Sequence, residues 1–146
     1  MSETVIDEEV KIEDIRYQVM NYIQEKLPEY KTWALKNLED YVAHFMGLGQ
    51  MFVSQGDSGE VNGVLALQFI DALKERKALN SKRKTSGVFI DVFIADSQTV
   101  REELVRQAML FSGVRKWIAF ERAKYNQRVS KMPWNFAERI ASYGET

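Results

Sequence analysis

The first third of the chain carries apolar side chains at intervals of three and four residues. This spacing predicts two amphipathic helices, over residues 12–27 and 31–46. Pro28 ends the first helix, because proline lacks an amide hydrogen and clashes with the preceding turn. Thr32 is the expected N-cap of the second helix, and the glycines of the segment 47–49 are its expected stop.

The pattern then changes to that of extended strands. Residues 50–55 and 61–71 are rich in apolar and β-branched side chains, and the glycine-rich segment 56–60 between them predicts a hairpin. Residues 87–96 are apolar at both odd and even positions. We therefore expect a central strand covered on both faces.

A helix and another strand follow the central strand. Residues 97–113 have a helical period that opens with Ser97 and closes with Gly113, and residues 114–123 are predicted to form a strand. A strand, a helix and a strand in succession predict a βαβ unit with parallel strands. A short helix is expected over 133–144, with Pro133 in its first turn.

These elements predict an α/β fold in which helices flank a mixed β-sheet. The expected order is α-α-β-β-β-α-β-α, and Val5–Val10 is a candidate for a further short strand at the N-terminus. A length of 146 residues suits a single domain, 1–146, with one hydrophobic core.

Composition excludes several kinds of chemistry. The chain contains no cysteine and one histidine, His44. Disulfides, thiol catalysis and zinc sites built from cysteine and histidine are therefore excluded, and we expect no metal. His44 follows the helical pattern next to Phe45, so we interpret it as a surface or boundary residue rather than a catalytic one. No apolar run reaches the roughly 20 residues of a membrane span, and the acidic start does not resemble a secretion signal.

Charge is distributed unevenly along the chain, although the formal net charge is −1. Residues 1–30 hold eight acidic and three basic side chains, whereas residues 74–84 hold six basic and one acidic. This second segment contains Lys82, Arg83 and Lys84, which are candidates for binding phosphates or an acidic partner. The alternative is a solvated loop without a ligand.

Asp91 is a polar exception in the predicted central strand. Burial would favour its use as a general base that removes a proton from an amine. The structural alternative is a carboxylate that accepts hydrogen bonds from backbone amides or pairs with an arginine. We favour the structural interpretation, because a buried carboxylate requires a partner in either case.

Four segments in the second half carry a recognisable pattern: VFIDVFIADS, VREELVRQAM, RKWIAFERAKYNQRV and PWNFAERI. The residues that carry it are Asp91, Trp117, Ile118, Ala119, Phe120, Arg122, Tyr125, Arg128, Trp134 and Phe136. With the order of elements, this pattern resembles the GNAT acyltransferase superfamily, and within it small GNAT-like proteins encoded by bacteriophages. The resemblance covers about residues 50–142.

The resemblance implies where acetyl-coenzyme A would bind and react. Asp91 would act as the base and Tyr125 as the acid that protonates the departing thiolate; the alternative for Tyr125 is packing. The cofactor would contact Phe93, Ile94, Ala95, Gln98 and Arg101. Active members of the superfamily have an Arg/Gln-x-x-Gly-x-Gly/Ala loop at this junction, where bare amides bind the pyrophosphate.

This chain departs from that loop. The matching run, from Ser97 to Glu103, contains no glycine, and Glu102 and Glu103 are expected to place negative charge in the first helical turn. We therefore expect a GNAT-like protein that is catalytically degenerate and acts by binding, with no cofactor. The alternatives are an N-acetyltransferase that uses acetyl-coenzyme A, and a nucleic-acid-binding accessory protein.

Partner and location follow from the same resemblance. We expect a protein partner or self-association, which Arg122 and Arg128 are candidates to support together with Lys82, Arg83 and Lys84. Nucleic acid is a weaker candidate for these basic residues, and no membrane partner is expected. A phage origin implies the cytoplasm of the infected host or the virion rather than secretion.

Overall fold

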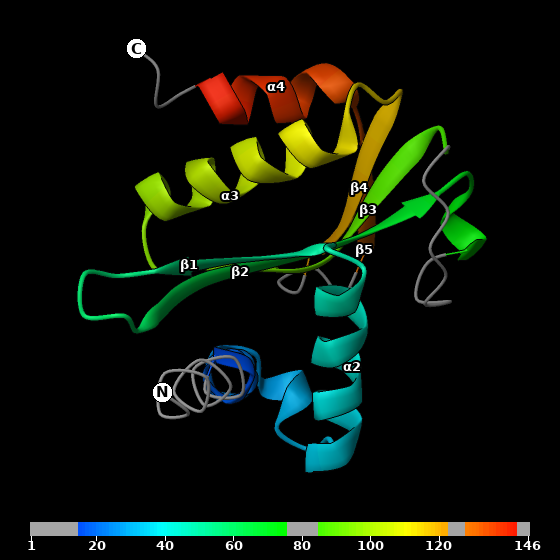
Figure 1. Ribbon diagram of the computed structural model, residues 1–146. Helices are drawn as coiled ribbons and strands as arrows, with labels where there is room; N and C mark the ends of the chain where they lie inside the picture. Colours follow the sequence, from blue (N-terminus) through cyan, green and yellow to red (C-terminus); the bar gives the residue numbers. More distant parts are fainter. Residues whose placement is uncertain (1–14, 76–84, 123–127, 143–146) are drawn as a thin grey trace, which may run out of the picture.

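The computed structural model describes residues 15–75, 85–122 and 128–142. In this part of the chain, helices lie on both faces of a mixed sheet in the strand order β1-β2-β3-β4-β5 (Figure 1). The strands are β1 Met51–Gln55, β2 Val61–Ile70, β3 Gly87–Ala95, β4 Trp117–Arg122 and β5 Arg128–Pro133. The described helices are residues 15–26, α2 Leu35–Gly47, α3 Gln98–Ser112 and α4 Trp134–Ser142, with 3-10 turns η1 Pro28–Tyr30 and η2 Leu73–Glu75.

The pairing of the strands confirms the predicted hairpin and βαβ unit. β1 pairs with β2 and β2 with β3 in antiparallel register, and β3 pairs with β4 in parallel. α3 makes the connection between the two parallel strands, as their direction requires. β3 is therefore the central strand of the sheet, which explains its run of apolar side chains.

Two helical layers cover the sheet, one on each face (Figure 1). The α3/α4 layer packs on Leu65, Leu67 and Ile90, among other residues of β2 and β3. The opposite layer, formed by the first helix, η1 and α2 and called here the α2 layer, packs on Val64 and Val92. Because both faces are covered by apolar side chains, ligands can reach the sheet only where this packing is interrupted.

A β-bulge interrupts the central strand at Asp91. Ala66 of β2 pairs with Val92, and the next residue, Leu67, pairs with Ile90, so Asp91 has no counterpart in β2. The extra residue reverses the alternation of side chains along β3. Even-numbered Ile90 faces the α3/α4 layer, whereas even-numbered Val92 faces the α2 layer.

The sequence prediction was wrong about the last strand. Residues 128–133 form β5, an edge strand that pairs antiparallel with β4 from Trp117↔Pro133 to Arg122↔Arg128. The prediction placed no strand there, because Val129 and Met132 are three residues apart and do not alternate with polar positions. Hydrogen bonding to β4 holds residues 128–133 in an extended conformation that their own sequence pattern does not predict. Pro133 accordingly ends β5, and α4 begins at Trp134.

Helix ends follow the expected signals in α3 but not in α2. The Ser97 hydroxyl accepts a hydrogen bond from the Val100 amide, and Gly113 ends α3 with a φ of 70° that favours glycine. The expected N-cap Thr32 is wrong: α2 begins at Leu35 after Ala34, and no side chain caps it. The Thr32 hydroxyl instead donates to the Glu29 carbonyl in the preceding turn, at 3.5 Å.

Candidate functional site: a cavity where two parallel strands separate

The parallel strands β3 and β4 separate part-way along their length. Their register runs from Gly87↔Trp117 to Ile90↔Phe120 and ends there, whereas β3 continues to Ala95. The bulged residue, Asp91, is the first residue of β3 beyond the last pair. We call the gap beside residues 91–95 of β3 the strand opening.

A cavity of about 640 Å³ lies at the strand opening. Its walls come from both faces of the sheet: Ile90 and Phe120 belong to the α3/α4 side, whereas Leu27 packs against the α2 layer. A cavity can reach both layers because the sheet is not continuous at this point. The other lining residues are Glu29, Leu65, Leu67, Val88, Asp91, Val92, Phe93, Arg101, Val105, Ala108, Met109, Ser112, Ile118, Trp134, Phe136, Ala137 and Ile140.

The cavity is elongated along α3. Its lining extends from Arg101 in the first turn of that helix to Ser112 in the last turn. Eleven residues at 1.5 Å each correspond to about 16 Å. The walls between these ends are aliphatic and aromatic, with small Ala108 of α3 and Ala137 of α4 on the helical side. Its shape and volume are those of a small-molecule site.

Asp91 is held at the cavity by a side chain of the α2 layer. Its Oδ2 accepts a hydrogen bond from the hydroxyl of Tyr41, a buried residue of α2. Burial, followed by the negative charge of Asp91, raises the pKa of Tyr41 well above its usual value. Tyr41 therefore remains a donor across the physiological pH range, and this donation stabilises the negative charge of Asp91.

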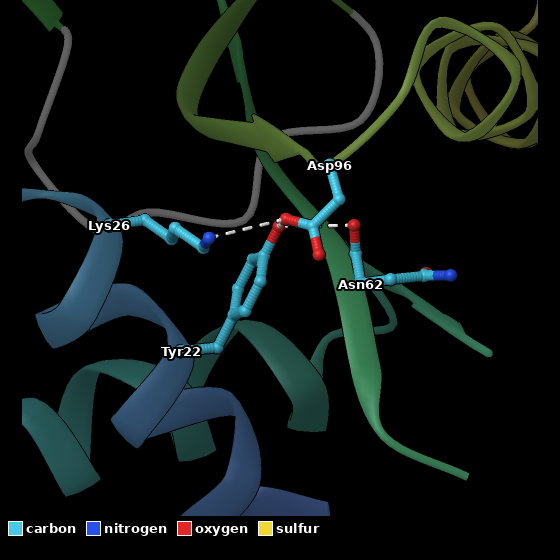
Figure 2. A network of polar contacts seen from close by, with 4 residues as sticks. All are labelled: Tyr22, Lys26, Asn62 and Asp96. Carbon is cyan, nitrogen blue, oxygen red and sulfur yellow. Dashed lines mark hydrogen bonds and ion pairs between the residues drawn. The ribbon is translucent and has the colours of Figure 1, made fainter. Parts of the chain in front are cut away.

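A second tyrosine fixes the far end of the strand opening. Asp96, directly after β3, accepts a hydrogen bond of 2.7 Å from the hydroxyl of Tyr22 in the first helix (Figure 2). The Tyr22 hydroxyl also lies 3.0 Å from the Asn62 carbonyl, and the Lys26 Nζ lies 3.6 Å from Asp96. Burial and the bond to Asp96 raise the pKa of Tyr22 above its usual range. The part of β3 that does not pair with β4 is thus attached to the α2 layer at both ends.

The entrance of α3 differs from the acidic site that the sequence predicted. The first turn of α3 contains no acidic residue. Glu102 is buried and accepts a hydrogen bond from Gln98, and Glu103 pairs with Arg106 at 2.5 Å. The prediction was wrong because it counted these residues one turn too close to the helix start.

The N-terminus of α3 is capped by Ser97, a residue of the chain itself. Its hydroxyl accepts from the Val100 amide at 3.2 Å, and its carbonyl accepts from the Arg101 amide at 3.0 Å. The Val100 amide is one of the amides that a helix N-terminus offers to an anion, whereas the bond from the Arg101 amide is the first hydrogen bond of the helix itself. A pyrophosphate at this position would have to compete with the serine cap.

The structure brings together some of the residues predicted to bind a cofactor and separates the others. Asp91, Phe93 and Arg101 line the cavity, and the Arg101 guanidinium lies 5.1 Å from the centre of the Phe93 ring. Ile94 faces the α2 layer instead, because the bulge determines which side chains of β3 point that way. Ala95 packs on the α3/α4 side without lining the cavity.

Several predicted residues cannot be placed at the site. Tyr125, Lys82, Arg83 and Lys84 lie outside the described residues. Arg122 and Arg128 are opposite each other in the β4–β5 register, which gives their backbone positions. His44 is partly buried, and its ring contacts Phe45 edge-on at a centroid distance of 5.3 Å. It does not line the cavity.

Sequence reasoning missed the tyrosine partners and the role of the closing helix. Tyr41 and Tyr22 follow the helical period of apolar residues, so nothing local distinguishes them from packing residues. Trp134 and Phe136 were noted as part of the pattern that resembles the GNAT superfamily, and they form part of the cavity wall. A signal was available for one contact: an aspartate in a central strand requires a donor, and a tyrosine is a suitable one.

Comparisons with known proteins add no assignment. No family model matches the sequence, and no match was found among curated proteins or solved structures. In the part of the chain that the structure describes, no helix is long and apolar enough to cross a membrane. No group of three or more metal-ligating side chains occurs among the same residues.

Proposed function

We propose that this chain is a ligand-binding protein with a GNAT-like arrangement, inactive as an acetyltransferase, whose ligand occupies the cavity at the strand opening. The observation that carries the proposal is that the cavity is lined from both faces of the sheet. Packed proteins contain few voids larger than a water molecule. Apolar lining side chains lose dispersion contacts when such a space is left unfilled, so an apolar ligand there stabilises the fold.

The entrance of α3 supports binding without a nucleotide. Catalysis with acetyl-coenzyme A requires a binding site for its pyrophosphate, and the amides at a helix N-terminus are the usual hydrogen-bond donors there. Here Ser97 occupies the Val100 amide, and the first turn has side chains where the superfamily has glycine. We therefore propose that no cofactor is needed for function.

Occupancy of the cavity is tested with an uncharged apolar dye. Nile red is titrated into the full chain, and we expect one saturable site whose fluorescence rises on binding. Ala108→Phe fills the cavity and abolishes this site, because Ala108 is a buried lining residue of α3. Leu110→Phe is the matched control, since Leu110 lies on the same helix, is 80% exposed and does not line the cavity. Equal binding by both variants would contradict the proposal.

A second candidate function is acyl transfer from acetyl-coenzyme A. The specific observation in its favour is that Asp91, the proposed base, lies at the cavity and at the first residue of the strand opening. Isothermal titration of acetyl-coenzyme A and of S-acetylpantetheine, which lacks the nucleotide, separates the two functions. Our proposal predicts similar, weak affinities. Acetyl-coenzyme A binding 100-fold tighter, with amine-dependent thiol release that Asp91→Asn abolishes, would establish the transferase.

The cellular context is proposed from the resemblance to phage proteins. We propose that the chain acts in the cytoplasm of an infected host or in the virion, through a protein partner or a second copy of itself. Mass spectrometry of purified virions and of infected-cell lysate distinguishes these two locations. Detection in neither fraction during infection would contradict the proposed context.

A further inference from the structure

The cavity has four polar lining residues, Glu29, Asp91, Arg101 and Ser112, in a lining that is otherwise apolar. Asp91 and Arg101 lie at the strand opening, and Ser112 lies at the end of α3. Tyr41 occupies one oxygen of Asp91, and a carboxylate has about four lone-pair positions. Asp91 can therefore accept a further hydrogen from a ligand without losing Tyr41.

Ser112 is the second, independent observation. Its side chain is 6% exposed and lines the cavity, and its hydroxyl oxygen is a buried atom without a hydrogen-bond partner among the described residues. Buried hydroxyls are normally hydrogen-bonded, and each exception calls for an explanation. The cavity lining also includes Val88, Ile118 and Trp134, whose side chains are largely apolar. A polar atom of a ligand would satisfy this hydroxyl.

We propose that the ligand is an elongated aliphatic molecule with a polar group at each end, one donating to Asp91 and the other bonded to Ser112. This inference rests on the proposed function, because it specifies the class of ligand for the same cavity. The distance from Asp91 to Ser112 determines the length of chain that fits. The polar lining groups determine which polar groups the ligand carries at its ends. A purely apolar chain of the same length leaves Ser112 unsatisfied.

Chain length is tested first, by displacing Nile red with straight-chain 1-alkanols of six to twelve carbons. Each methylene buried between Ile90 and Ala137 is expected to tighten binding about fourfold until the cavity is filled. Ala137→Leu shortens the cavity and moves the end of this trend to shorter chains. Ile140→Ala lengthens it and moves the end to longer chains. If one of these variants does not fold, the other is sufficient for the test. Glu138→Ala is the control: Glu138 is exposed and next to Ala137, so this variant should leave the trend unchanged.

The polar end is tested by comparing each 1-alkanol with the α,ω-diol of the same length. In the unmodified chain, a diol of the matching length is expected to bind at least as tightly as the alkanol, because Ser112 receives its second hydroxyl. Ser112→Ala weakens the diol about tenfold or more and leaves the alkanol unchanged or tighter. Ser54→Ala, on β1 and outside the cavity lining, leaves both unchanged.

Failure of this inference is distinguishable from failure of the proposed function. If Nile red binds and Ala108→Phe abolishes binding, but Ser112→Ala affects diol and alkanol equally, the bipolar ligand is wrong and the cavity remains a binding site. The absence of any dependence on chain length, with Nile red still bound, overturns the aliphatic ligand in the same way. If Nile red itself does not bind, the proposed function fails as well.

Discussion

The Tyr41 hydroxyl of α2 donates a hydrogen bond to Asp91, the one residue of β3 that the bulge leaves without a counterpart in β2. The contact joins the α2 layer to the point where β3 and β4 stop pairing. It explains how a carboxylate is tolerated in the central strand of the sheet, because the negative charge receives a hydrogen bond from a neutral donor. The shape of the strand opening therefore depends on α2 as well as on the sheet.

Removing this donor is predicted to destabilise the fold. Tyr41→Phe deletes the hydroxyl and keeps the ring, whose centroid lies 4.9 Å from that of the Phe45 ring. A hydrogen bond to a charged group contributes about 1.5–3 kcal/mol, so the free energy of unfolding in urea should fall by that amount. Tyr17→Phe is the matched control, because Tyr17 is 48% exposed, and it should change stability by less than about 0.5 kcal/mol. A loss no larger than that of the control would show that the contact is not stabilising.

The raised pKa of Tyr41 predicts a loss of stability in alkaline solution. The folded chain holds the tyrosine proton more tightly than the unfolded chain, in which ionisation occurs near pH 10. The contribution is therefore fully present below pH 10, and it declines as the pH rises above that value, by up to about 1.4 kcal/mol per pH unit. Urea unfolding between pH 8 and about pH 11 should show a shallower decline for Tyr41→Phe than for the unmodified chain and for Tyr17→Phe. Parallel curves for all three would refute the assignment.

The network at Asp96 should contribute through Tyr22 rather than through Lys26. Tyr22 is buried and donates at 2.7 Å to a carboxylate that is 44% exposed, so Tyr22→Phe is expected to cost about 1 kcal/mol, less than Tyr41→Phe. Lys26 and Asp96 are both partly exposed at 3.6 Å, so Lys26→Met should cost about 0.5 kcal/mol or less. Hydrogen exchange of amides in residues 15–26 should accelerate in the tyrosine variant and remain unchanged in the lysine variant. The opposite order would mean that the ion pair, not the tyrosine, attaches the first helix.

Close packing of α3 on β2 yields a prediction at Gly63. A methyl group there would collide with Val100 and would lie 2.9 Å from Cδ1 of Leu104, so these side chains of α3 would have to shift. Gly63→Ala should therefore cost about 1–3 kcal/mol in thermal or urea unfolding. Gly47→Ala is the control, because Gly47 is helical and nothing lies within 4 Å of an added methyl group. That variant should be stabilised by up to about 1 kcal/mol, and equal effects at both positions would contradict the packing argument.

The sequence was sufficient to predict the elements whose own pattern determines them. The two amphipathic helices, the hairpin, the central strand and the crossover helix that opens at Ser97 all follow from local periodicity and turn residues. β5 could not be predicted in this way. Its extended conformation depends on pairing with β4, and its apolar and polar side chains do not alternate. The exact N-terminus of α2 was also beyond reach, since Thr32 bonds to the preceding turn instead of capping the helix.

The candidate site was predictable only at Asp91, Phe93 and Arg101. A carboxylate inside a central strand is visible in the sequence, and its position beside a strand–helix junction indicates a site. The partner Tyr41 lies 50 residues away and looks like any other apolar position of an amphipathic helix. The bulge at Asp91 determines that Ile94, and not Phe93, faces the α2 layer; it depends on the register between β2 and β3 and leaves no local signal.

The central claim, that a ligand enters the strand opening and contacts both faces of the sheet, is tested most directly by amide NMR. The ¹⁵N-labelled full chain is titrated with 1-octanol, and the shifted signals are mapped. We predict saturable shifts at Leu27 on the α2 side together with Ile90 and Ala137 on the α3/α4 side. Shifts confined to the exposed apolar residues Leu110 and Val114, or no saturable shifts at all, would contradict the account.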